Sequence, residues 1–199
     1  MKSLLAAAVS VAGFLAVALP VRADDAGDTA ALQAKVRAAL RSAKTFVETV
    51  KIKPNSQVPG GGTIVYTVVA PDRFRQKTSG PEPGGDDTII VGHEVYGSKG
   101  VGSPWEVQTW SNELVIGFES DVFNPEVISL EADATGGLGS FKRHDPNGFQ
   151  KDATLTCTYE KASFRPEACS NDMYDISYSN YDDPSVEVPV PLRSKRVDR

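Results

Sequence analysis

Much of this sequence consists of short segments in which apolar and polar residues alternate, separated by turns that contain Pro or Gly. The segments with this pattern or with dense β-branched residues are Phe46–Ile52, Thr63–Val69, Arg73–Thr78, Thr88–Val91, Val95–Tyr96, Thr154–Glu160, Met173–Ser179 and Val186–Val188. A period of two is typical of strands that bury one face, and turns at hairpin spacing favour an antiparallel meander. The pattern therefore predicts a mainly β domain.

One segment near the start of the chain has the period of a helix instead. Asp28 or Thr29 can cap a helix that runs to about Ala43. Its apolar side chains share one face: Leu32, Val36, Leu40 and Ala43. Because a single apolar stripe has to be covered, we expect this helix to pack on the sheet. The fold class is then α+β, mainly β.

The first 23 residues have the features of a signal peptide. Lys2 gives a positive start, Leu4–Leu19 is an apolar run, and Pro20 precedes a small-residue cleavage site that ends at Ala23. The alternative is an uncleaved anchor, but a spanning helix needs about 20 apolar residues and this run is shorter. We expect a periplasmic protein with no stable membrane anchor. Its parts would be a signal peptide at 1–23, one domain at 24–192 and a mobile charged tail at 193–199.

The charge of the chain excludes some partners. The formal net charge is −5 over 199 residues. An acidic protein lacks the basic footprint that nucleic acid requires. The same balance argues against a surface held to anionic lipid by charge.

The two cysteines of the chain, Cys157 and Cys169, both follow the predicted signal peptide. In an oxidising compartment a disulfide between them is the expected state, and two free thiols are the alternative. The Pro-bearing turn between them can return the chain so that the cysteines oppose each other on neighbouring strands.

Sequence motifs for catalysis, metal binding or cofactor binding are missing. His93-Glu94 begins like a zinc protease helix, but no second His follows at position 97. His93 and His144 are the only histidines, and the chain has no Gly-x-Ser-x-Gly elbow or Walker-type loop. We therefore predict no catalytic residue, no metal site and no cofactor.

Aromatic residues recur in the predicted strands and suggest a hydrophobic cavity. We expect six of them to face the concave side of one curved sheet: Phe46, Tyr66, Phe74, Tyr96, Trp105 and Tyr174. The alternative is that they fill the core between sheet and helix. Alternation alone does not separate a pocket from a filled core.

The order of these elements resembles the LolA-like superfamily of envelope lipoprotein carriers. The resemblance rests on residues 70–75 (APDRFR), on Ile89–Gly92 with Val95-Tyr96, and on residues 178–184 (YSNYDDP) followed by Val188-Pro189. It implies an incomplete, curved antiparallel barrel plugged by helices. It also implies an apolar cavity that receives acyl chains, and no enzyme activity.

These observations lead to two functional hypotheses. The first is a soluble periplasmic binder or carrier of a hydrophobic ligand, such as a lipid or the acyl chains of a lipoprotein. The second is an envelope protein-interaction or stress-sensing module that uses the same fold with a filled cavity.

Overall fold

The computed structural model describes residues 26–56, 58–80, 85–100, 102–112, 123, 125–144 and 153–197. The predicted signal peptide at 1–23 lies outside the described residues. Within the described part of the chain, no helix has both the length and the apolar character needed to cross a membrane.

The described elements are one α-helix, one short 3-10 helix and twelve strands. In chain order they are α1 Ala26–Ser42, β1 Thr45–Ile52, β2 Gly62–Val69, β3 Arg73–Ser79, β4 Asp86–Val91, β5 Glu94–Lys99, β6 Trp105–Thr109, β7 Val127–Glu131, η1 Thr135–Gly137, β8 Leu138–His144, β9 Thr154–Glu160, β10 Pro166–Ser170, β11 Tyr174–Ser179 and β12 Ser194–Arg196.

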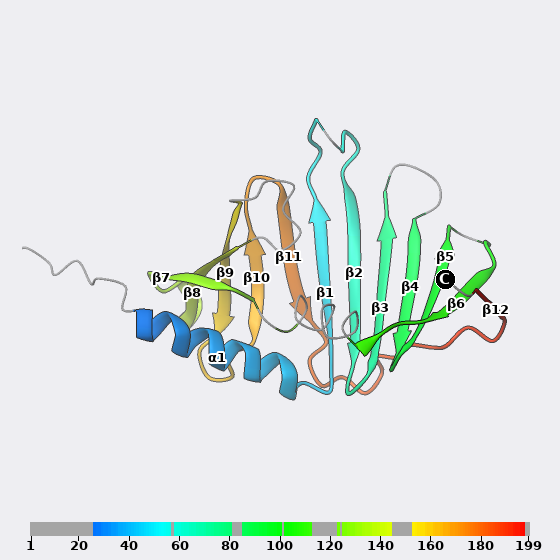
Figure 1. Ribbon diagram of the computed structural model, residues 1–199. Coiled ribbons are helices and arrows are strands. Elements are labelled where there is room, and N and C mark those ends of the chain that lie inside the picture. Colours follow the sequence, from blue (N-terminus) through cyan, green and yellow to red (C-terminus); the bar gives the residue numbers. More distant parts are fainter. Residues whose placement is uncertain are drawn as a thin grey trace, which may run out of the picture.

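All twelve strands belong to one sheet, in the order β12-β6-β5-β4-β3-β2-β1-β11-β10-β9-β8-β7. Neighbouring strands are antiparallel, except that β12 runs parallel to β6. Figure 1 shows that the sheet is curved. Among the described strands, the first and last of this order do not pair with each other, so the barrel stays open. Together with the helix on its concave side (Figure 1), this topology confirms the predicted fold class: a mainly β, incomplete and curved antiparallel barrel with a helix in its open side.

The helix α1 lies across the concave side of the sheet near β7 (Figure 1). Its predicted stripe is buried in the main core, as expected: Leu32, Val36, Leu40 and Ala43. Arg41 in the last turn complements the negative end of the helix dipole. The helix ends one residue before the predicted end, and it begins at Ala26, two residues before Asp28 and three before Thr29, so neither predicted residue caps it.

The sheet has an apolar cluster on each face. Cross-strand partners share a face, so the chain of partners Phe46, Val68, Phe74, Ile90 and Val95 marks the concave side. This concave core continues across β8 to β11 and includes α1. A smaller cluster on the convex face contains Ile89, Tyr96, Val107 and Val188, with Val69, Val91 and Trp105 packed against it.

The last part of the chain differs from the prediction in two ways. Val186–Val188 is not a strand, because the prolines that flank it lack the N–H groups that a strand ladder uses. Instead, Val188 is buried against the convex face. The segment 193–199, predicted as a mobile tail, contains β12, whose residues pair with Trp105, Glu106 and Val107 of β6.

Candidate functional site

Four of the six predicted cavity residues come together on the concave face. Phe46, Phe74 and Tyr174 are buried in the main core, and Tyr66 packs against it half-buried. The register explains this, because Phe46 opposes Val68, which opposes Phe74. Tyr174 lies opposite Ile52 at the far end of β1.

At this place the concave side is filled. The ring of Phe123 packs edge-on against Phe46 at 5.9 Å and against Phe74 at 5.8 Å between centroids. Phe46 is 0% exposed and Phe74 is 3% exposed. These two side chains are therefore core residues here, and a role of the predicted set in ligand binding remains a prediction.

Tyr96 and Trp105 lie on the opposite, convex face, which differs from the sequence expectation. Phe74 opposes Ile90, and Ile90 opposes Val95, so Val95 takes the concave position and the next residue, Tyr96, points away. Both positions 95 and 96 carry apolar side chains, so alternation could not assign the face. Trp105 follows a glycine-rich loop, which breaks the phase from the preceding strand.

An open cavity of about 610 Å³ lies farther along the concave face, over β4 to β6. We call it the β4–β6 groove. Its lining consists of Asp86, Thr88, Val95, Gly97, Ser98, Lys99, Ser103, Pro104, Glu106, Gln108, Trp110 and Val197. The volume is within the range of about 300–1,000 Å³ that is usual for small-molecule sites.

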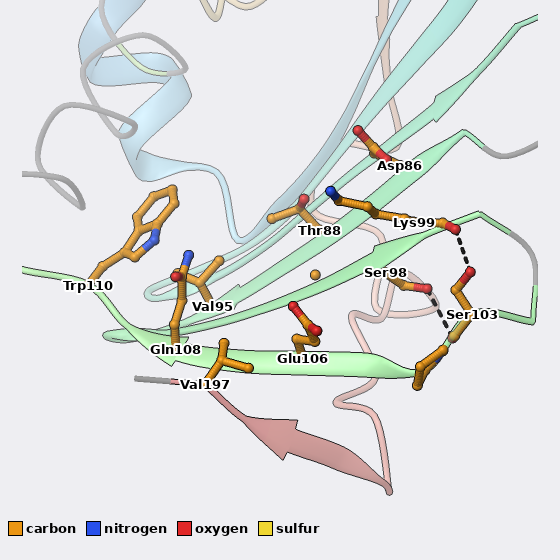
Figure 2. Close-up of a pocket in the computed structure, with 12 residues that line it drawn as sticks. Asp86, Thr88, Val95, Ser98, Lys99, Ser103, Glu106, Gln108, Trp110 and Val197 are labelled. Atoms are coloured by element: carbon orange, nitrogen blue, oxygen red, sulfur yellow. Dashed lines mark hydrogen bonds between the residues drawn. The ribbon is translucent and has the colours of Figure 1, made fainter. Parts of the chain in front are cut away.

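The two ends of the β4–β6 groove differ in chemistry (Figure 2). Trp110, Val95 and Val197 lie toward one end together with the amide of Gln108, and Asp86 and Lys99 lie toward the other. Asp86 and Lys99 are cross-strand partners of β4 and β5. The loop after β5 is held by the Ser98 hydroxyl, which donates to the carbonyl of Ser103 at 3.2 Å. The groove therefore offers a more apolar end, without charged side chains, and a charged end to one ligand.

The sequence analysis did not identify this groove. Of the predicted cavity set none lines it, although Val95 directly precedes Tyr96. An available signal was Gly97, a glycine inside a strand, which often marks a close approach of a ligand or another backbone. A Cβ added to Gly97 would meet no atom within 4 Å.

A buried polar cluster in the concave core also escaped the sequence analysis. Glu48 on β1, Tyr178 on β11 and Arg143 on β8 are all buried. The Tyr178 hydroxyl donates to Glu48 Oε1 at 3.2 Å, and Arg143 lies 3.9 Å from the same oxygen. The sequence feature that could have revealed this cluster is Glu48 itself, a carboxylate on the same face of β1 as the apolar residues Phe46 and Val50.

Burial sets the protonation behaviour of this cluster. Removal from water raises the pKa of Glu48 above its usual value, while Arg143 and Tyr178 oppose that shift. Burial likewise raises the pKa of Tyr178 above the normal range. The cluster lies among the buried apolar side chains of the core, and none of its three residues lines the groove.

The predicted disulfide joins Cys157 of β9 and Cys169 of β10, which stand directly opposite each other. Both sulfur-bearing side chains are buried in the concave core. The described residues contain no group of three or more His, Cys, Asp or Glu that could hold a metal ion.

No family model matches this sequence, and no curated protein matches it significantly. Among solved structures the chain is similar to LprF from Mycobacterium bovis, at 14% identity and a TM-score of 0.48, over 84% of this chain and 99% of that chain. It is similar to an uncharacterized conserved protein from Thermus thermophilus, at 12% identity and a TM-score of 0.46, over 85% of this chain and 99% of that chain. It is also similar to a LolA superfamily protein from Nitrosomonas europaea, at 11% identity and a TM-score of 0.32, over 82% of this chain and 94% of that chain.

Proposed function

We propose that this protein is a non-catalytic binder or carrier of a hydrophobic ligand, a lipid or the acyl chain of a lipoprotein, in the periplasm. The observation that carries the proposal is the β4–β6 groove on the concave face. Its volume suits part of an acyl chain, and Trp110, Val95 and Val197 provide apolar contact. The polar end near Asp86 and Lys99 suits the head of an amphiphile.

Gly97 keeps the floor of the groove open. It lies two residues after Val95, on the same face of β5, and has no side chain. Because an added Cβ would meet open space, a larger residue here should enter the groove without disturbing the sheet. The position therefore allows a steric test of ligand binding.

The two tryptophans of the chain permit a local readout. Trp110 lines the groove and Trp105 packs on the convex face. A Trp105→Phe variant keeps Trp110 alone, and a Trp110→Phe variant keeps Trp105 alone. A brominated fatty acid quenches tryptophan fluorescence only at contact range, so we expect strong quenching in the first variant and little in the second.

The blocking variant completes this experiment. In the Trp105→Phe background, Gly97→Leu should raise the Kd for the brominated fatty acid at least about tenfold, because the new side chain occupies ligand space. The melting temperature should stay the same, and Gly97→Ala serves as a milder control. Equal quenching of both tryptophans, or unchanged affinity in Gly97→Leu, would contradict binding in this groove.

The second candidate is a protein-interaction or stress-sensing module with a filled cavity. It is favoured by the packing of Phe123 against Phe46 and Phe74, which closes the middle of the concave face. If neither tryptophan responds to the fatty acid while the protein remains folded, this candidate is the better account.

A further inference from the structure

The C-terminal segment presents apolar side chains to solvent. Val188 anchors it to the convex face at 3% exposure, and the chain then continues to β12 at the edge of the sheet (Figure 1). Between these points, Val190 is 36% exposed and Leu192 is 102% exposed. Single exposed leucines are common on proteins, so the meaning of Leu192 depends on its neighbours.

Those neighbours are basic. Arg193 and Lys195 are both exposed. Arg196 is engaged by Glu94 at 2.7 Å and by the Thr109 hydroxyl at 3.1 Å, which holds β12 in place. Arg193 and Lys195 are thus two exposed basic side chains outside that ion pair, on a chain whose net charge is −5, and Glu106 of β6 is the register partner of Lys195. Because salt screens charges beyond about 10 Å, a nearby surface would respond to this local charge more than to the distant acidic residues.

The same segment borders the β4–β6 groove. Val197 follows β12 directly and lines the groove, and its backbone N–H donates to the Val107 carbonyl at 2.9 Å. Lys195 is in register with Glu106, another lining residue. A surface that contacts residues 190–195 would therefore meet the molecule at the edge of its groove.

We propose that residues 190–195, which we call the docking segment, bind reversibly to the surface of an anionic phospholipid bilayer. Val190 and Leu192 enter the boundary between headgroups and acyl chains, and Arg193 and Lys195 contact lipid phosphates. The contact is too small for a permanent anchor. The inference rests on the proposed function in one respect: if the groove binds a lipid, the bilayer at its edge is the source or the acceptor of that lipid.

The test is flotation of the purified protein with vesicles. We expect binding to phosphatidylcholine vesicles that contain phosphatidylglycerol, weak binding to phosphatidylcholine alone, and loss of binding at about 1 M salt. The Arg193→Gln/Lys195→Gln variant should bind the anionic vesicles roughly 25-fold more weakly, about fivefold for each charge. Leu192→Ser should bind roughly tenfold more weakly.

A matched control removes the same charge elsewhere. Arg37 on α1 and Arg73 on β3 are also exposed, and the Arg37→Gln/Arg73→Gln variant should float like the wild type. Absence of wild-type flotation with anionic vesicles, or an equal loss in the control variant, would overturn the proposal. A dimer in light scattering that Leu192→Ser abolishes, without vesicle binding, would assign the segment to a second copy of this chain instead.

The docking segment and the groove can fail separately. Gly97→Leu should float normally although it no longer binds the brominated fatty acid. Arg193→Gln/Lys195→Gln should still show quenching of Trp110 by that fatty acid. Loss of flotation in Gly97→Leu would show that vesicles are bound through the groove, and would overturn the role of the docking segment.

Discussion

Arg143 on β8 lies 3.9 Å from Oε1 of Glu48 on β1, although three strands of the same sheet separate β8 from β1. In a flat sheet four strand spacings would place these strands about 19 Å apart. The ion pair is therefore possible only because the sheet curls around its concave core. Tyr178 completes the site by donating to the same carboxylate oxygen at 3.2 Å.

Removing the cation from this pair should be costly. Arg143→Met leaves Glu48 buried without its charged partner, which should lower the free energy of unfolding by about 3–5 kcal/mol in urea titrations. The neighbouring Lys142 forms an exposed pair with Glu131 at 3.2 Å, so Lys142→Met should cost less than about 1 kcal/mol. Similar losses in both variants would show that the buried pair does not stabilise the curvature.

Glu48 should also give stability a specific pH dependence. Because burial raises its pKa in the folded state above the ordinary value of 4.5, the folded protein keeps this proton more readily than the unfolded chain does. Its contribution is fully present below pH 4.5 and is lost as the pH rises through the folded-state pKa.

The Glu48→Gln variant isolates this effect. It lacks the titrating group, so the stability of the wild type relative to the variant should fall as the pH rises from about 4 to 8. Urea unfolding of both proteins at each pH cancels the contribution of all other groups. A difference that stays constant over this range would mean that Glu48 titrates normally.

The disulfide should stabilise the last strands of the sheet. Cys157 and Cys169 are separated by 12 positions, and closing a loop of this size is worth about 3 kcal/mol through the unfolded chain. Cys157→Ala/Cys169→Ala should therefore lower the free energy of unfolding by at least that amount, because both side chains are also buried. Intact mass after alkylation without reductant should show no modified cysteine, and two modified cysteines would refute the bond.

The helix should depend on its buried stripe. Leu40 is buried in the concave core, so Leu40→Ala should lower the free energy of unfolding by about 2–5 kcal/mol. Arg37 is exposed on the same helix, and Arg37→Ala should change the free energy of unfolding by no more than about 0.5 kcal/mol. Equal melting temperatures for Leu40→Ala and the wild type would show that α1 is not docked.

Local periodicity was enough to predict the elements that have one buried face. The stripe of α1, the alternation of β1 and β3 and that of β9 and β11 each repeat with the period of their own backbone, whereas β2 was predicted from its dense β-branched residues. The pairing of Cys157 with Cys169 followed in the same way, from a short turn between two neighbouring strands. These features depend on residues that are close in sequence.

The remaining features depend on contacts between residues that are distant in sequence. Ile89-Ile90 and Val95-Tyr96 are apolar on both faces, so only the pairing with Phe74 decided that Tyr96 points to the convex side. Backbone hydrogen bonds, which no side-chain pattern reveals, placed β12 beside β6. The curl of the sheet brought Arg143 to Glu48, and the register of β4 to β6 left Gly97 as the open floor of a groove. The sequence by itself thus determined the local elements and the buried faces of most of them, because a repeat imposes its own geometry. Only the tertiary structure decided which part of the concave face is filled and which part stays open, because that depends on how distant side chains pack.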